Sequence, residues 1–241
     1  MRATEFEFRI RFIIIMAFFT VGFWCYGLDR VNVSVMLTER LMGHPMRSAA
    51  DRHVLQAVLG LGALLAVLAA LIRTWAAAYL QSGVVHDTNL HGEELVADGP
   101  YRYVRNPLYL GGILFAIGFA MAASRLGFVV VVAGLTVFYY RLIAREELLL
   151  SEMQGGSYRQ YLKAVPRLMP SLAPRVAPSG LVPRWGQAVV GEAFMGFFAT
   201  ASVCFAATLN RRLFLIMIVG GIAASFIAKV VVRRRRQPQT P

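Results

Sequence analysis

The segment GPYRYVRNPLYLGG, residues 99–112, concentrates hydrogen-bonding side chains directly before a long apolar run. Arg105 lies within it, and Arg141, Glu146 and Glu147 follow the apolar run. Arginine offers paired donors to a carboxylate or a phosphate, and glutamate can receive an ammonium group. These residue types suit a small ligand that carries a positive and a negative charge close together.

The tyrosines of the same segment, Tyr101, Tyr103 and Tyr109, have aromatic faces that can stack on a heterocycle or meet a cation. Asn106 and Pro107 predict the first residues of a helix, with the Asn106 side chain as its cap. Arginines and tyrosines also gather at bilayer edges without any ligand. The glycine and the two prolines around Tyr101 favour a shaped loop over such a girdle.

A second polar group, His86 and His91 with Glu93 and Glu94, contains residue types that bind metals. The spacing of the two histidines differs from the i, i+4 spacing that places two ligands on one helix face. We therefore expect no metal site. The sequence also lacks the GxGxxG and P-loop patterns, so a Rossmann-type cofactor site is not expected.

The elements that must position these groups are membrane helices. Hydrophobic residues make up 57% of the 241 residues and charged residues only 16%, against about 25% charged in soluble proteins. Several uncharged segments approach the roughly 20 residues that a helix needs to cross a bilayer. They predict an all-α polytopic membrane protein with six transmembrane helices at 12–28, 54–72, 107–124, 126–140, 193–209 and 213–228.

The basic residues predict how these helices are oriented. With six crossings and an inner N-terminus, the inner segments hold 18 of the 25 lysines and arginines, and the positive-inside rule assigns such segments to the cytoplasm. Both termini and the candidate site are then cytoplasmic. The RRRR run at 233–236 is expected to pair with anionic lipid headgroups, so the net charge of +12 requires no nucleic-acid partner.

The chain divides into three predicted parts. These are N-terminal transmembrane helices at 1–80, a core at 81–170, and a proline-rich linker with a C-terminal helix pair and basic tail at 171–241. Within the core, the polar segments 81–106 and 141–170 emerge on the same side of the membrane, and the helical hairpin 107–140 brings them together. Two loops that are distant in sequence are thus expected to form one site.

Several local signals predict the connections between the helices. Residues 29–53 read as an outer loop, and SRLG at 124–127 predicts a tight turn inside the hairpin. Gly155 and the glycine after it predict a helix break, and the many prolines that follow predict an extended segment. Gly60 and Gly62 are expected to let a neighbouring helix approach closely.

The ordered series GPYRYVRNPLYLGG, a hydrophobic hairpin, REELLL, YRQYL and VPRLMP resembles the isoprenylcysteine carboxyl methyltransferase and phospholipid methyltransferase family. The resemblance covers about residues 90–170 and leaves out the last two helices. It implies an integral membrane enzyme with a cytoplasmic pocket for S-adenosylmethionine. The acceptor of the methyl group would be lipophilic: an isoprenylcysteine-like carboxylate, a lipid or a thiol.

The resemblance also implies roles for individual residues. Arg141 would hold the acidic group of the acceptor, and Glu146 or Glu147 would hold the amino group of the cofactor. Arg105 would bind or orient either the acceptor or the cofactor. Arg141, Glu146 and Arg105 form the implied catalytic set. The implied cofactor pocket consists of His91, Leu95, Val96, Gly99, Tyr101, Arg105, Asn106, Pro107, Leu108, Tyr109, Glu146 and Glu147.

Two residues depart from the family pattern. The histidine that precedes Leu-Val in the family would fall at Glu93, whereas His91 lies two residues earlier. Asn106 stands where the family more often has histidine, and an asparagine cannot act as a base. Transfer to an acceptor that arrives as an anion needs positioning rather than proton removal, so these residues favour such an acceptor.

Two other interpretations of the sequence remain open. Membrane sterol and enone reductases, which use NADPH, have a similar C-terminal layout, and a non-catalytic scaffold could keep the same fold. The helices at 186–232 could shape the opening for a lipophilic substrate or form a homodimer contact. Glu192 lies at the start of the first of them, where an acid marks either a functional site or a favourable interaction with the helix dipole.

Overall fold

The computed structural model describes residues 2–80 and 97–236, and the regular elements within these ranges are helices. Its one β feature there is an isolated bridge between Asn32 and Ser124. The predicted all-α class is therefore confirmed for the described residues. The helices are α1 Glu5–Arg9, α2 Arg11–Trp24, α3 Val33–Met42, α4 Ala49–Tyr79, α5 Pro107–Ala120, α6 Arg125–Gln154, α7 Gly156–Ala164, α8 Trp185–Gly191, α9 Ala193–Thr208 and α10 Arg211–Arg236, with the 3₁₀ helices η1 Cys25–Gly27 and η2 Gly99–Arg102.

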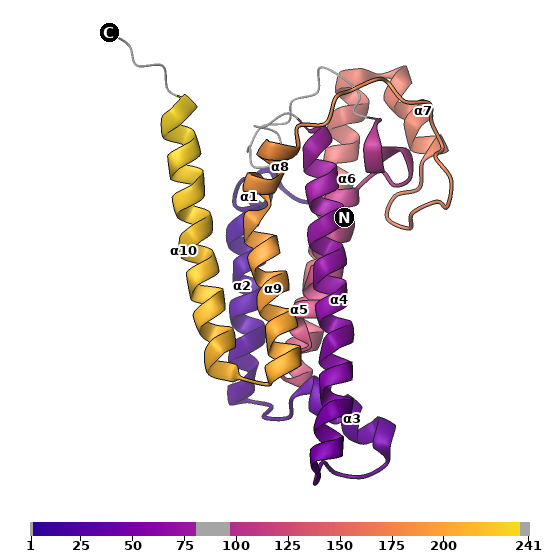
Figure 1. Ribbon diagram of the computed structural model, residues 1–241. Helices are drawn as coiled ribbons and strands as arrows, with labels where there is room; N and C mark the ends of the chain where they lie inside the picture. The colour runs from indigo at the N-terminus through magenta and orange to yellow at the C-terminus, as the bar shows by residue number, and fades with distance from the viewer. Residues whose placement is uncertain (1, 81–96, 237–241) are drawn as a thin grey trace.

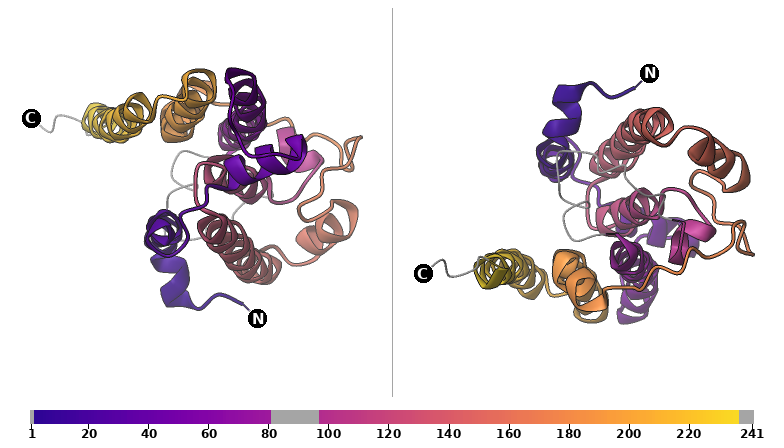
Figure 2. Two further views of the ribbon diagram at one scale, coloured as in Figure 1. Left: turned by 90° about the horizontal axis from the view of Figure 1, so that it is seen from below. Right: turned by 90° about the horizontal axis from the view of Figure 1, so that it is seen from above.

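The long helices form an elongated bundle in which α2, α4, α5, α6, α9 and α10 run side by side (Figure 1). Viewed along the bundle, α5 lies in the middle, and α10 lies at one edge next to α9 (Figure 2). We call the end that carries η2, α7 and α8 the site end. The opposite end, which carries α3 and the turn between α9 and α10, is the far end.

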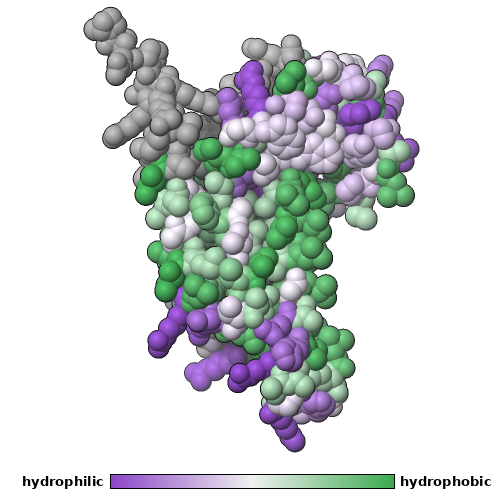
Figure 3. Space-filling model, viewed as in Figure 1, coloured by the Kyte–Doolittle hydropathy of each residue, from purple (hydrophilic) through white to green (hydrophobic). Residues whose placement is uncertain are grey.

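On the face seen in Figure 3, an apolar belt covers the bundle between two more hydrophilic ends. Among the described residues, α4 and α6 are long and apolar enough to cross a membrane, and α8 and α9 together would make a third span, bent by 62°. Residues Arg11–Gly27 and α5 are shorter apolar helices, and α5 with its 14 residues extends only about 21 Å at 1.5 Å per residue. All six predicted segments are thus helical, while six complete crossings stay a prediction.

The turns of the core follow the sequence signals. The Ser124 hydroxyl accepts a hydrogen bond from the Gly127 amide at 3.1 Å, which starts α6 after only four residues that separate it from α5. Gly155, with φ of +60°, separates α6 from α7. The proline-rich residues 165–184 contain no helix. The tight hairpin, the helix break and the extended segment were all predicted correctly.

The predicted outer loop at 29–53 is partly wrong, because it contains α3. The Asn32 side chain accepts a hydrogen bond from the Val35 amide at 3.1 Å and caps the helix, and Gly43 ends it with φ of +75°. The Ser34 hydroxyl donates to the Met121 carbonyl at 2.6 Å. This contact packs α3 against the far end of the hairpin.

Helices α4 and α5 approach each other through two glycines. A Cβ on Gly118 would lie 2.3 Å from the Gly62 carbonyl oxygen, whereas a Cβ on Gly60 would meet nothing within 4 Å. The expectation of a close approach is therefore right for Gly62 and wrong for Gly60. Gly60 instead faces an open groove beside α9.

The C-terminal helices pack on the same core. Phe198 of α9 and Phe214 of α10 contact Phe119 of α5 at ring-centroid distances of 5.1 and 5.9 Å. Phe198 also contacts Phe115 at 5.9 Å. Aromatic pairs at such distances add to the stabilisation from buried area. The C-terminal helix pair, which follows the predicted core in the sequence, is thus packed against α5, the central helix of the bundle.

Gly118→Ala should lower the thermal stability of the protein in detergent, because the new methyl group cannot fit against the Gly62 carbonyl. Overpacking of this kind costs about 1–3 kcal/mol. Gly60→Ala is the matched control, since it has free space and improves helix propensity by up to about 1 kcal/mol. Equal shifts of the melting temperature in the two variants would contradict the close approach.

Candidate functional site

The carboxylate of Glu147 joins three segments at the site end. Its Oε1 accepts hydrogen bonds from Arg105 Nε at 3.1 Å and from Asn106 Nδ2 at 3.2 Å, and its Oε2 accepts one from Arg167 Nη2 at 2.6 Å. The Glu147 side chain is only 7% exposed. A buried charge must be paired to be tolerated, and three donors satisfy this requirement.

Arg105 connects the start of α5 to the segment that follows α7. Its Nη1 donates to the carbonyl of Leu162 and, at 2.9 Å, to that of Val165. Its backbone amide donates to the Pro166 carbonyl at 2.9 Å. Arg105 therefore fixes the end of α7 and the beginning of the proline-rich segment in addition to pairing with Glu147.

Asn106 occupies the N-cap position of α5, and Pro107 follows as the first helical residue. The predicted capping by the Asn106 side chain is wrong, because this side chain makes no cap hydrogen bond. It donates instead to Glu147 and, at 3.2 Å, to the Arg167 carbonyl. Capping would use the side-chain oxygen as an acceptor, whereas here the Nδ2 group donates, and its hydrogen bond to a charged acceptor sets the orientation of the side chain.

Glu146 faces a different neighbour from Glu147. The Tyr109 hydroxyl donates to Glu146 Oε1 at 2.6 Å, and the Tyr109 ring lies 5.4 Å from that of Tyr139. Successive residues on a helix point about 100° apart, so one acid faces α5 and the other faces the loop and α7. The two adjacent glutamates thus serve two separate polar centres.

The 3₁₀ turn η2 depends on Gly99 and holds Tyr101. Gly99 has φ of +57°, and a Cβ at this position would lie 2.3 Å from the Tyr79 ring. The Tyr101 carbonyl accepts a hydrogen bond from the Tyr161 hydroxyl at 2.8 Å. Burial raises the pKa of Tyr101 well above its ordinary value, so its hydroxyl is neutral. A neutral, buried tyrosine suits a wall of a binding pocket.

Arg141 is bound by the N-terminal segment. Its Nη2 donates to Glu7 Oε2 at 2.8 Å, its carbonyl accepts the Ala3 amide at 3.1 Å, and Arg145 Nη1 reaches the Ala3 carbonyl at 3.4 Å. The Nε atoms of both arginines are buried and have no hydrogen-bond partner in the described ranges. The structure therefore places Arg141 and Arg145 apart from the Glu147 cluster, against α1.

The first turn of α1 holds the Glu7 carboxylate that pairs with Arg141. Thr4 and Glu7 form a capping box, in which the Glu7 amide donates to the Thr4 hydroxyl and the Thr4 amide to Glu7. The hydrogen bond from the Thr4 backbone, together with Arg141 and against the effect of burial, holds the pKa of Glu7 below its ordinary value. Glu7 is therefore a carboxylate at neutral pH.

A buried ion pair links the C-terminal helices to the start of α5. Arg73 on α4 donates from Nε and Nη2 to the two carboxylate oxygens of Glu192, at 2.7 and 3.0 Å, and from Nη1 to the Leu108 carbonyl at 3.0 Å. The Arg73 and Glu192 side chains are 15% and 2% exposed. Gly111 makes room for this pair, since a Cβ there would lie 2.5 Å from Arg73 Cγ.

Sequence reasoning singled out Glu192 and missed Arg73 as its partner. The signal available was an arginine near the inner end of an apolar helix, where a buried charge needs a counter-charge. Glu192 lies at the bend between α8 and α9. The bend directs its carboxylate toward α4.

The proline-rich residues 165–184, which we call the strap, close over η2. The Ser171 amide donates to the Tyr103 carbonyl at 3.0 Å, and the Arg175 amide donates to the Arg102 carbonyl at 2.8 Å. Figure 1 shows the strap running from α7 past η2 to α8. The strap and the η2 loop are thus fixed to each other through backbone hydrogen bonds.

Asp98 anchors the second half of the strap. Its carboxylate accepts hydrogen bonds from the amides of Ser179 and Leu181, at 3.0 and 2.9 Å, and from the Ser179 hydroxyl. Burial raises the pKa of Asp98, but these hydrogen bonds outweigh it and hold the pKa below its ordinary value. The stabilisation from Asp98 is therefore complete at neutral pH and is lost only as the pH falls through this lowered pKa.

The predicted site residues are only partly brought together. Arg105, Asn106 and Glu147 share one cluster, Tyr109 and Glu146 form the adjacent pair, and Pro107 and Leu108 lie in the same first turn of α5. Gly99 and Tyr101 shape η2 next to them. His91, Leu95 and Val96 lie outside the described residues, as does the candidate metal group of His86, His91, Glu93 and Glu94.

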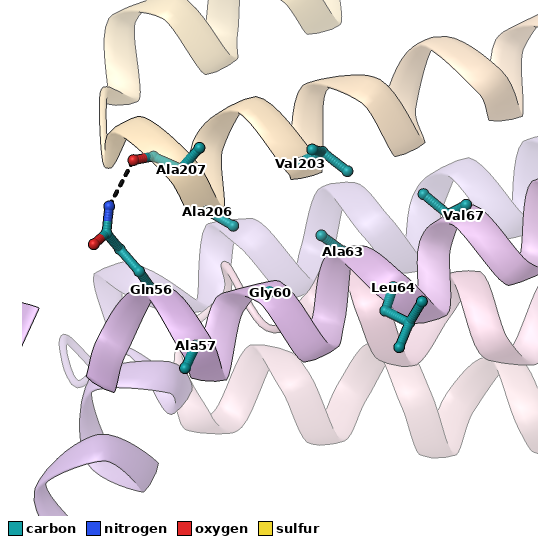
Figure 4. A pocket seen from close by; sticks show the side chains of 9 residues that line it. All are labelled: Gln56, Ala57, Gly60, Ala63, Leu64, Val67, Val203, Ala206 and Ala207. Atoms are coloured by element: carbon teal, nitrogen blue, oxygen red, sulfur yellow. Dashed lines mark hydrogen bonds between the residues drawn. The ribbon is translucent and has the colours of Figure 1, made fainter. Parts of the chain in front are cut away.

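A separate groove lies between α4 and α9, toward the far end of the bundle (Figure 4). It has a volume of about 610 Å³ and is lined by small and apolar side chains with one amide, that of Gln56. Its lining residues are Gln56, Ala57, Gly60, Ala63, Leu64, Val67, Val203, Ala206 and Ala207. None of the polar groups described above borders it.

Comparison with known proteins identifies the class. Residues 57–156 match the family model of phospholipid methyltransferases, a range that includes α5, the whole of 99–112 and both glutamates. The resemblance seen in the sequence is therefore confirmed over this part of the chain: residues 57–156, less than half of the 241, match the phospholipid methyltransferase family. No solved structure gives a significant match.

Three curated proteins are similar over part of the chain. The protein-S-isoprenylcysteine O-methyltransferase of Schizosaccharomyces pombe is 41% identical over 80 residues, which are 32% of this chain and 33% of the relative. The nickel-cobalt-cadmium resistance protein NccN of Alcaligenes xylosoxydans xylosoxydans is 26% identical over 147 residues, 61% of this chain and 65% of the relative. The cobalt-zinc-cadmium resistance protein CzcN of Cupriavidus metallidurans is 29% identical over 147 residues, 61% and 64%. The chain thus spans between one third and about two thirds of their lengths.

Glu192→Gln should lower the melting temperature of the detergent-solubilised protein markedly. Removing one partner of a buried ion pair leaves an uncompensated charge, here Arg73, and typically costs about 3–5 kcal/mol. Asp29→Asn is the control, because Asp29 pairs at 3.1 Å with Arg125, whose side chain is 52% exposed. Melting temperatures that fall equally in the two variants would show that the Arg73 pair is no more important than a surface contact.

Asp98→Asn should free the strap without unfolding the bundle, since the neutral amide cannot match the carboxylate as an acceptor of three hydrogen bonds. Tryptic cleavage after Arg175 in the folded protein is the measurement, and the variant should be cut faster. Asp29→Asn again serves as the control. A cleavage rate unchanged by Asp98→Asn would refute the anchoring role of this residue.

Proposed function

We propose that the protein is an integral membrane methyltransferase that transfers a methyl group from S-adenosylmethionine to a lipophilic acceptor. The observation that carries the proposal is the convergence of Arg105, Asn106 and Arg167 on Glu147, next to the Tyr109–Glu146 pair. Both centres belong to the predicted site. All these residues except Arg167 lie in the segment that matches the phospholipid methyltransferase family.

The chemistry of the donors and acceptors fits the cofactor. Its amino-acid end carries an ammonium group and a carboxylate. A carboxylate has about four acceptor positions, so Glu146 can receive the ammonium group in addition to the Tyr109 hydroxyl. Glu147, which already accepts three donors, has the role of holding Arg105 and Arg167 in place. Tyr101 offers a neutral, buried ring beside this centre.

When bound, S-adenosylmethionine would supply an electrophilic methyl group on a sulfonium sulfur, and the acceptor would supply the electron pair for the new bond. The residues of the chain then have to bind and align the two reactants and exclude water. Alignment of this kind supplies a large part of the rate enhancement when two reactants must meet. Asn106 neither gains nor loses a proton near neutral pH. An acceptor that arrives as an anion needs no proton removal, so an asparagine at this position is compatible with such an acceptor.

Arg141 is the residue that we assign to the acidic group of the acceptor. Its present partner, the Glu7 carboxylate at 2.8 Å, occupies the position that such a group would take. A carboxylate acceptor would replace Glu7 and could also use the unpartnered Nε atoms of Arg141 and Arg145. The relative named as a protein-S-isoprenylcysteine O-methyltransferase supports a carboxylate, and the family name keeps a lipid acceptor open. A thiol acceptor would be the third class.

The membrane placement is part of the proposal. We place the site end and both termini in the cytoplasm because of the distribution of basic residues. The acceptor would then reach the site from the bilayer, and the cofactor from the cytoplasm. The C-terminal pair, α9 and α10, pairs with α4 and α5 on one side, and the outer face of α10 is available for a homodimer.

Two other functions receive less support. The family match, which includes the Glu146–Glu147 pair, favours a methyltransferase over an NADPH-dependent reductase or a non-catalytic scaffold. Metal resistance, which the names of two relatives mention, is not extended to this chain. Within 2–80 and 97–236, no group of three or more His, Cys, Asp and Glu residues could hold a metal ion.

Calorimetric binding of S-adenosylhomocysteine to the purified protein is the test. Wild type should bind, and Glu146→Gln and Arg105→Ala should each weaken binding by about 10- to 100-fold, because hydrogen bonds to charged groups contribute about 1.5–3 kcal/mol. Asp29→Asn, which alters the far end, should bind like wild type. A folded wild type that binds NADPH and no S-adenosylhomocysteine would replace methyl transfer with the reductase. Binding of neither would leave the scaffold.

A further inference from the structure

The strap exposes large apolar side chains where a water-facing loop would carry polar ones. Met169, Leu172 and Val182 have relative exposures of 81%, 104% and 82%. Single exposed apolar residues are ordinary on protein surfaces. Three in one short segment, held in a fixed conformation, indicate a surface that is covered by something apolar.

The same region carries a uniform positive charge. Residues 153–191 contain no aspartate or glutamate and include five basic residues, all exposed: Arg159, Lys163, Arg167, Arg175 and Arg184. A loop that only connected two helices through water would not need all of its charged residues to be positive. The partner of this surface should therefore be negatively charged as well as apolar.

The position of the strap identifies this partner. Helix α7 and the strap project sideways from the bundle at the site end, and part of the strap descends beside the helices (Figure 1). On the face seen in Figures 1 and 3, it reaches the level of the upper part of the apolar belt. A surface that is basic, partly apolar and located at the rim of the belt matches the headgroup region of a bilayer.

We propose that the strap, residues 165–184, is a lipid-binding surface that inserts its apolar side chains among the headgroups of anionic lipids. Its basic residues contact the phosphates and carboxylates, each strengthening the association at low ionic strength. This inference requires that the bundle spans a membrane, and it does not depend on methyl transfer.

Hydrogen bonds link the strap to the candidate site. Arg102 Nε donates to the Val176 carbonyl at 2.9 Å, and the Ser171 amide donates to the Tyr103 carbonyl at 3.0 Å. Arg167 of the strap also holds Glu147. A lipid that fixes the strap therefore also fixes the η2 loop, which gives the membrane surface a direct influence on the order of the site.

The test uses a fluorescent label on a single cysteine, in a background with Cys25→Ser and Cys204→Ser. The label is attached to Leu172→Cys, and the matched control is Glu152→Cys, an exposed acidic position at the end of α6. The protein is reconstituted in vesicles of phosphatidylcholine alone or mixed with phosphatidylserine. Quenching by lipids that carry a nitroxide at the headgroup reports contact with the interface. The arginines at 233–236 are replaced by glutamine throughout, so that the basic tail does not contribute.

We expect strong quenching at residue 172 and little at residue 152, with an increase at residue 172 when phosphatidylserine is present. Replacing the strap residues Arg175 and Arg184 with glutamine should remove most of this increase, because each basic residue near an anionic surface contributes about a fivefold gain in affinity. Equal quenching at both positions in both vesicle types would overturn the proposal. Strong quenching at residue 172 that ignores phosphatidylserine would overturn its anionic part. Neither readout involves the cofactor, so the result is independent of S-adenosylhomocysteine binding.

Discussion

The site end of the molecule depends on one buried carboxylate. Glu147 projects from α6 into a position with little access to water, and its charge is balanced by donors from the loop before α5 and from the strap. Removing a partner from a buried charge is far more costly than losing a surface contact. The loop before α5, α6 and the beginning of the strap therefore keep their positions together. Three segments of the chain become one unit.

A second buried charge pair extends this unit to the C-terminal helices. Arg73 binds Glu192 and the Leu108 carbonyl, so α4, α5 and the bend between α8 and α9 meet at one guanidinium group. The middle of the bundle is held differently, by glycine contacts between α4 and α5 and by packed phenylalanine rings. Directional hydrogen bonds and ion pairs thus set the geometry of the polar end, whereas van der Waals packing holds the apolar middle together.

Much of the fold could be predicted from the sequence because its signals are local. Uncharged runs located the long helices, and Ser124, Gly155 and the prolines located the turns, since each acts on its own neighbourhood. The pairings that build the site are not local. Nothing in the spacing of Arg73 and Glu192, or of Arg141 and Glu7, shows that they meet, because the contact depends on how helices pack. The prediction that Asn106 caps a helix failed for a related reason, because its side chain is oriented by a hydrogen bond to a carboxylate that is distant in sequence.

The attachment of the N-terminal segment to α6 has a practical consequence for handling the protein. Ala3 is 3% exposed, and both its amide and its carbonyl are engaged by Arg141 and Arg145. Residue 3 is therefore a packed part of the molecule, in contact with the helix that carries both site glutamates. A bulky label attached at this residue would press against the contact. Protein labelled there would then differ from unlabelled protein in the region where the acceptor is expected to bind.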